Sequence, residues 1–126
     1  MPFFRWNEIA EDSQPGPTLP AGMTRRGVIL GDLMLGLHGA GAGLRPEPHA
    51  HPNDQIAIMI RGRMLMEIDG ESRVMGPGEF AYVPANVVHR IETLDEDAVV
   101  LDVFAPFRQD IAQRLAEMRQ KSGSAR

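Results

Sequence analysis

Cysteine is absent from the 126-residue chain. Its absence excludes disulfide bonds, thiolate nucleophiles, and thiolate-bound zinc or iron–sulfur centres. Any metal ion held by this chain must therefore be bound through nitrogen and oxygen ligands.

Positive charge and long apolar runs are also scarce. Thirteen lysines and arginines against seventeen acidic residues give a net charge of -4, which argues against a nucleic-acid partner. No apolar run approaches the roughly 20 residues that span a bilayer, so no membrane partner is expected. The start MPFFRWNEIAEDS turns acidic after four residues and does not resemble a secretory signal. Together with the missing cysteines, it favours a cytoplasmic location.

What the chain does contain indicates one globular domain over residues 1–126. Its 43% hydrophobic and 24% charged residues are ordinary for such a domain. Thirteen glycines and ten prolines separate short apolar runs, which is typical of an all-β sandwich or barrel. The expected strands are 27–30, 32–38, 55–61, 63–68, 80–84, 87–93 and 98–106, with a loop over 13–24 and a hairpin turn at Asp69-Gly70.

The tail breaks this rhythm. After Pro106, residues 107–121 place Ile111, Leu115 and Met118 at helical spacing. This stripe predicts a short C-terminal helix that packs on the barrel or on a second subunit. The barrel itself is expected to span about 25–106.

The most informative stretch is HAHPNDQ, residues 49–55. An extended segment projects alternate side chains to one face, so His49 and His51 can share one ion. His89, on a later strand, completes a set if the sheet closes, and the bend after His51 lets the amide oxygen of Gln55 act as a fourth ligand. A lone histidine is usually structural, but this grouping favours a metal site. His38 lies outside the pattern and is interpreted as a structural or surface histidine.

The stretch GLRPEPHAHPNDQIAIMIRG resembles the first sequence motif of the cupins. Gly43, His49, His51, Gln55 and Gly62 fall on the positions of its glycines and ligands.

GEFAYVPANVVHRIET resembles the second cupin motif, with Gly78, Pro84 and His89 in place. It departs from the motif at Asn86, where a glycine is usual, and at Thr93, where asparagine is common. The resemblance implies an all-β double-stranded β-helix, the cupin jelly-roll barrel.

A narrower resemblance is to the small single-domain pectin-degradation cupins of the KdgF type. HAHPNDQIA and LDVFAPFRQDI are similar to two runs of that family. The resemblance implies three histidines and a glutamine as metal ligands, and conversion of 4,5-unsaturated uronates to their linear keto form during pectin or alginate breakdown. The residues that it implies at the sugar are Asp102, Phe104 and Arg108.

The residues themselves leave alternatives for these three positions. Asp102 and Phe104 face the same way on one strand, either into the barrel or with Asp102 solvated outside. An inward Asp102 suits proton transfer, and Phe104 suits a pocket wall. Arg108 either clamps a substrate carboxylate bidentately or is a simple surface charge.

The ligand set also bears on the chemistry. Three imidazoles and an amide leave the ion's charge uncompensated, which favours a Lewis acid; Ni, Zn, Fe, Mn, Co and Cu all suit such ligands. A metal-dependent enzyme acting on a small sugar acid is therefore the first hypothesis. A cupin dioxygenase and a non-catalytic metal-bearing module that binds a sugar acid are the alternatives. The apolar strands and tail helix also predict a homodimer.

Overall fold

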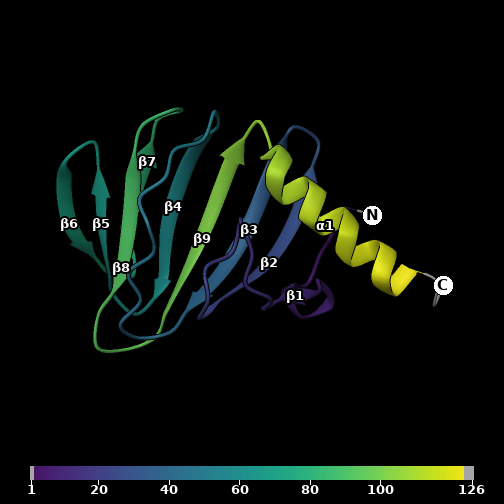
Figure 1. Ribbon diagram of the computed structural model, residues 1–126, viewed down its shortest axis with the longest axis horizontal. Coiled ribbons are helices and arrows are strands. Elements are labelled where there is room, and N and C mark those ends of the chain that lie inside the picture. Colours follow the sequence, from purple (N-terminus) through teal and green to yellow (C-terminus); the bar gives the residue numbers. More distant parts are fainter. Residues whose placement is uncertain (1, 124–126) are drawn as a thin grey trace.

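Two antiparallel sheets, one α-helix and a short 3₁₀-helix, η1 (Trp6–Glu8), make up the fold, seen in the computed structural model of residues 2–123 (Figure 1). The larger sheet has the order β1 (Glu11–Asp12), β2 (Met23–Leu30), β3 (Leu33–Ala40), β9 (Ala98–Ala105), β4 (Asp54–Arg61) and β7 (Phe80–Val83). The smaller has the order β6 (Glu71–Met75), β5 (Met64–Ile68) and β8 (His89–Thr93). The predicted all-β architecture with a C-terminal helix is confirmed.

The core between the sheets is built from alternating side chains. Buried and less buried positions alternate along β3 and β9 over the whole of each strand, as expected for strands with one face packed. Methionines fill much of the interior, where their unbranched side chains adapt to irregular space. The buried members of this cluster are Leu19, Met23, Ala40, Ala57, Met59, Met64, Met66, Met75, Ala98 and Val100.

Helix α1 (Gln109–Gly123) covers the rest of the larger sheet's inner face, lying beside β2 and β3 in Figure 1. Its Ile111 and Leu115 form a second buried cluster with Met34 and Phe104, which confirms the predicted apolar stripe. The helix begins at Gln109, two residues later than predicted, because the Arg108 carbonyl accepts the first helical hydrogen bond, from the Ala112 N–H.

The N-terminal region is more regular than predicted. Strand β2 begins at Met23, inside the segment 13–24 that was expected to be a loop, and β1 pairs with it through Glu11 and Asp12. The prolines and glycines of this segment obscured the start of β2 in the sequence. In the structure, Met23 already belongs to the strand and points into the core. The Asp69-Gly70 hairpin is confirmed, with φ values of 51° and 84° and Ile68 opposite Glu71. Such left-handed backbone at both positions is what a type I′ turn requires.

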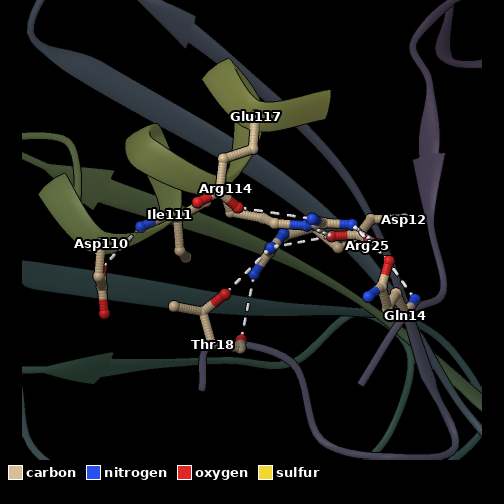
Figure 2. A network of polar contacts seen from close by, with 8 residues as sticks. All are labelled: Asp12, Gln14, Thr18, Arg25, Asp110, Ile111, Arg114 and Glu117. Atoms are coloured by element: carbon tan, nitrogen blue, oxygen red, sulfur yellow. Dashed lines mark hydrogen bonds and ion pairs between the residues drawn. The ribbon is translucent and has the colours of Figure 1, made fainter. Parts of the chain in front are cut away.

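A buried carboxylate ties the N-terminal arm to the sheet and to α1 (Figure 2). Asp12 accepts hydrogen bonds from Arg114 Nε at 2.8 Å and Nη2 at 3.0 Å, and its Oδ2 lies 3.5 Å from Arg25 Nη2. Arg25 is only 1% exposed, and it also donates to the carbonyl and hydroxyl oxygens of Thr18. Asp12 therefore neutralises a fully buried guanidinium. Within residues 2–123, no helix is long and apolar enough to cross a membrane.

We expect Asp12→Asn to lower the free energy of unfolding by about 3 kcal/mol at neutral pH, because it leaves the buried Arg25 charge uncompensated. Denaturant titration measures this difference. Hydrogen bonds from Arg114 hold the pKa of Asp12 below its ordinary value of 3.8, against the opposing effect of burial. The stabilisation is thus present above that pH and is lost as the pH falls through the lowered pKa. A difference between the two proteins that persists unchanged at pH 2 contradicts this account.

Candidate metal centre

The H-x-H segment is fixed by backbone pairing with β8. The His49 N–H donates to the His89 carbonyl at 3.0 Å, and the His89 N–H donates to the His49 carbonyl at 2.9 Å. Residues that exchange both hydrogen bonds lie directly opposite each other with side chains on one face. The two imidazole centroids are accordingly 4.3 Å apart.

His51 joins the same face two residues later. Its carbonyl accepts a 2.8 Å hydrogen bond from the Asn86 N–H, which holds the segment along the smaller sheet. Asn86 has φ 66°, the left-handed backbone for which glycine is usual in this motif and which asparagine tolerates. The His51 ring lies 4.9 Å from that of His89 and 5.6 Å from that of His49. One ligand nitrogen from each ring falls within 4.8 Å of the others.

Two of the imidazoles are oriented by main-chain carbonyls. His51 Nδ1 is 3.1 Å from the Asn53 carbonyl oxygen, and His89 Nδ1 is 2.9 Å from the Val87 carbonyl oxygen. A carbonyl oxygen only accepts, so Nδ1 of each ring carries the hydrogen and Nε2 presents a lone pair. Metal-binding histidines are oriented by the same kind of contact. His89 Nε2 is buried and has no hydrogen-bond partner among the described residues.

Gln55 lies at the start of β4 with its amide aimed at His51. Its Nε2 donates to Asp102 Oδ1 at 2.7 Å, so its Oε1 is the atom 3.0 Å from His51 Nε2. With Nδ1 of His51 protonated, this contact brings two acceptors together, and a cation between them removes the repulsion. A cation would likewise satisfy the lone pair of His89 Nε2, which has no hydrogen-bond partner among the described residues. The residues present thus fit a divalent transition metal held by nitrogen and one amide oxygen.

The charge state of the histidines suits this role. Burial, with added repulsion from His89, Arg108 and His51, lowers the pKa of His49 to about 4. Burial also lowers the pKa of His51 and of His89, and the Arg108 charge acts in the same direction. At neutral pH all three rings are uncharged, which is the form that binds a metal.

Asp102 points into the barrel and is 7% exposed, so the solvated alternative does not hold. Its Oδ1 receives Gln55, and its Oδ2 lies 2.9 Å from His38 Nδ1. His38 is 7% exposed, which excludes the surface interpretation. Sequence reasoning missed its contact with Asp102, for which the register of β3 and β9 is needed.

Phe104 and Arg108 stack behind His51. Phe104 is 2% exposed and meets the His51 ring edge-on, with centroids 5.6 Å apart. The Arg108 guanidinium carbon lies 5.3 Å from the Phe104 centroid. One edge of the Arg108 guanidinium is engaged by Asp110, at 3.2 Å from Nε and 2.7 Å from Nη2. Asp110 was not singled out from sequence, although its place two residues after Arg108 makes the contact local.

A cavity of about 450 Å³ opens between β5, β6 and β7. Its walls include Met66, Ile68, Tyr82 and Val87. Ile68 is the register partner of His89, and the Val87 carbonyl orients the His89 ring. None of the four expected metal ligands is among the residues that line this cavity.

Comparison with known protein families identifies the family to which the chain belongs. A model of the cupin domain matches residues 39–104, the range that holds the three histidines, Gln55 and Asp102. The chain belongs to the cupin family. Its two antiparallel sheets are thus those of a cupin fold.

Individual relatives show which cupins this chain is similar to. The chain is 32% identical over 103 residues to the pectin degradation protein KdgF of Dickeya dadantii, which covers 79% of this cupin and 93% of that protein. The structure of KdgF from Halomonas sp. has a TM-score of 0.75 at 30% identity, covering 86% and 96% of the two chains. An RmlC-like cupin from Shewanella frigidimarina has a TM-score of 0.77 at 22% identity, a likeness of fold alone.

We expect the protein purified from metal-supplemented medium to hold about one transition-metal ion per chain, and His89→Ala to hold almost none. The substitution removes a buried nitrogen that has no hydrogen-bond partner within residues 2–123. Elemental analysis by mass spectrometry measures the content. Val88→Ala, at the exposed neighbouring position, serves as the control and should retain the ion. Equal metal content in the two variants would show that His89 is not a ligand.

Proposed function

We propose that this cupin is a metal-dependent enzyme that opens and tautomerises 4,5-unsaturated uronates during pectin or alginate breakdown. The observation that carries the proposal is the inward Asp102, whose carboxylate lies beside the Gln55 amide and the histidine cluster. The 32% identity to a protein named for pectin degradation supports the choice of substrate.

The reaction is an isomerisation without a co-reactant. The hydroxyl at C1 of the cyclic sugar loses its proton, the bond from C1 to the ring oxygen breaks, and C1 becomes an aldehyde. The ring oxygen takes up a proton and remains on C5 as the hydroxyl of an enol. Loss of that hydroxyl proton with protonation at C4 yields the keto form. The reaction thus needs proton transfers at the C1 hydroxyl, the ring oxygen and C4, which is the task of a positioned acid–base group.

His49, His51, Gln55 and His89 would hold the metal. The bound ion, one of Ni, Zn, Fe, Mn, Co or Cu, supplies a Lewis acid whose charge four neutral ligands leave uncompensated. Anionic protein ligands would weaken that electrophile. Gln55 in place of a carboxylate therefore suits ring opening better than the oxidation chemistry of iron.

Asp102 is the group that moves the proton. Each of its oxygens has a second lone pair beyond the contacts to Gln55 and His38, so the carboxylate can accept from a sugar hydroxyl. Because Asp102 is buried, it exchanges a proton with the bound substrate and not with bulk water.

Arg108 binds the substrate carboxylate through the guanidinium edge formed by Nη1 and Nη2, while Asp110 engages the other edge. Phe104 supports the position of Arg108, because the guanidinium packs over its ring. Being almost fully buried, Phe104 acts mainly by holding His51 and Arg108 at a fixed separation.

Incubation of the metal-loaded protein with 4,5-unsaturated galacturonate should accelerate the ultraviolet loss of the enol ether over the spontaneous rate. Asp102→Asn should lower kcat by about 10²–10⁴-fold, because the amide still accepts from Gln55 but cannot take up a proton. Asp95→Asn, at an exposed position, is the matched control and should leave the rate unchanged.

The alternatives give different results in the same preparation. No acceleration with any of the six metals overturns the proposal. Oxygen consumption by the iron-loaded protein would favour a dioxygenase. Binding of the uronate with equal affinity by the original protein and Asp102→Asn, without turnover, would favour a sugar-acid-binding module.

We also propose that the predicted homodimer forms through the outer face of the larger sheet. Strand register aligns apolar side chains across that face in two rows: Leu35, Val103, Ile56 and Tyr82, then Leu37, Leu101, Ile58 and Phe80. Ile56, Phe80 and Tyr82 are 39%, 69% and 57% exposed. A contiguous apolar face of this kind marks an interaction site, and the same face on a second copy complements it by symmetry.

Ile56→Lys should convert a dimer into a monomer, because it places a charge at the centre of the first row. Light scattering coupled to gel filtration at micromolar concentration gives the mass. Val74→Lys is the matched control: Val74 is 43% exposed on the smaller sheet, and its substitution should leave the dimer intact. A monomeric parent protein, or a dimer that survives Ile56→Lys, refutes this interface.

A further inference from the structure

His38 occupies an inner position of β3, opposite Val100 of β9. Its ring turns back along the strand over Gly36: a Cβ atom at Gly36 would lie 2.9 Å from His38 Cε1 and 3.4 Å from Nδ1. That first distance is closer than any side chain permits. The imidazole thus occupies the space that a side chain at position 36 would fill.

Asp102 stands directly opposite Gly36, with Ala57 of β4 on its other side. Small neighbours on both sides let two polar side chains approach the carboxylate from the diagonal positions of the adjacent strands. Gln55 Nε2 reaches Oδ1 at 2.7 Å from β4, and His38 Nδ1 reaches within 2.9 Å of Oδ2 from β3.

The contact between His38 and Asp102 is close but not aligned as a hydrogen bond, and His38 Nδ1 has no aligned partner among the described residues. The carboxylate is therefore the polar group toward which this buried imidazole is turned.

We propose that His38 is a positioning residue which, through Asp102, fixes the Gln55 amide with its oxygen toward the metal, and that Gly36 provides the room for it. An amide has two ends, and only its oxygen is a metal ligand. An acceptor-only carboxylate selects the NH₂ end, provided that the carboxylate itself is held. The proposal rests on the metal centre of the proposed function but not on its substrate.

The first test is metal affinity. Isothermal titration of the metal-free protein with Zn²⁺ should show about 10–100-fold weaker binding for His38→Ala, the usual effect of removing an outer-shell partner. His38→Gln, which retains a donor, should recover part of the loss. Val100→Ala is the matched control: it removes buried volume opposite His38, so it should lower the stability and leave the affinity unchanged. Affinity of His38→Ala within twofold of the parent overturns the proposal.

Gly36→Ala provides a second route to the same contact. Gly36 does not have positive φ, so an added methyl group displaces the ring without backbone strain. It should weaken Zn²⁺ binding when His38 is present and have little further effect in the His38→Ala background. Additive losses in the double variant would assign the effect of Gly36 to the sheet and count against the proposal.

A measurement on the metal-free protein separates this inference from the function. The side-chain amide protons of Gln55 should give a shifted, slowly exchanging ¹H–¹⁵N signal that moves toward free-amide values in His38→Ala. If the uronate assay fails while the metal binds and this change is seen, the positioning role stands and the proposed function falls. If the parent protein binds no metal, both fall. If turnover is normal and the Gln55 signal is unchanged in His38→Ala, the positioning role falls alone.

Discussion

The reciprocal backbone hydrogen bonds between His49 and His89 are the contact on which the centre depends. They attach the segment that enters β4 to the smaller sheet, before that same segment crosses into the larger one. A single chain segment thus carries His49 against the smaller sheet, His51 in the loop that follows and Gln55 on the larger sheet. Because such a pair fixes side chains on one face, the two imidazoles meet without any attraction of their own, and at neutral pH both rings are uncharged and available to an ion.

The chain of polar contacts from His51 through Gln55 and Asp102 to His38 is buried. It is accommodated because the inner positions flanking Asp102 are Gly36 and Ala57, so the volume that larger residues would fill is available to polar side chains. Beyond this chain, Phe104 connects the histidines to the apolar contacts of α1. The stability of the helix and the geometry of the site are therefore coupled through one aromatic ring.

Local patterns in the sequence were enough to predict the elements that local chemistry determines. The Asp69-Gly70 turn and the apolar stripe with Ile111 and Leu115 are confirmed. Strand alternation left open whether Asp102 points inward or outward, and the structure turns it inward. The H-x-H spacing together with His89 predicted a cluster that the fold does assemble.

Contacts set by strand register could not be predicted in the same way. His38 reaches Asp102 only because β3 and β9 pair with Gly36 opposite the carboxylate, a relation between distant segments. The alternation of Gly36 and His38 in LMLGLHGA is the one local sign of it. Likewise, Asp12 joins β1, β2 and α1 through Arg25 and Arg114, and no spacing in the sequence links those positions.

The proposed centre holds one metal ion through three imidazole nitrogens and the oxygen of an oriented amide. The decisive measurement is a crystal structure of the nickel- or zinc-loaded protein with anomalous differences recorded at the metal edge. We expect one strong peak about 2.0–2.2 Å from a ring nitrogen of His49, His51 and His89 and from Gln55 Oε1. A peak at other residues, or a Gln55 amide turned with its nitrogen toward the ion and its oxygen toward Asp102, would contradict it.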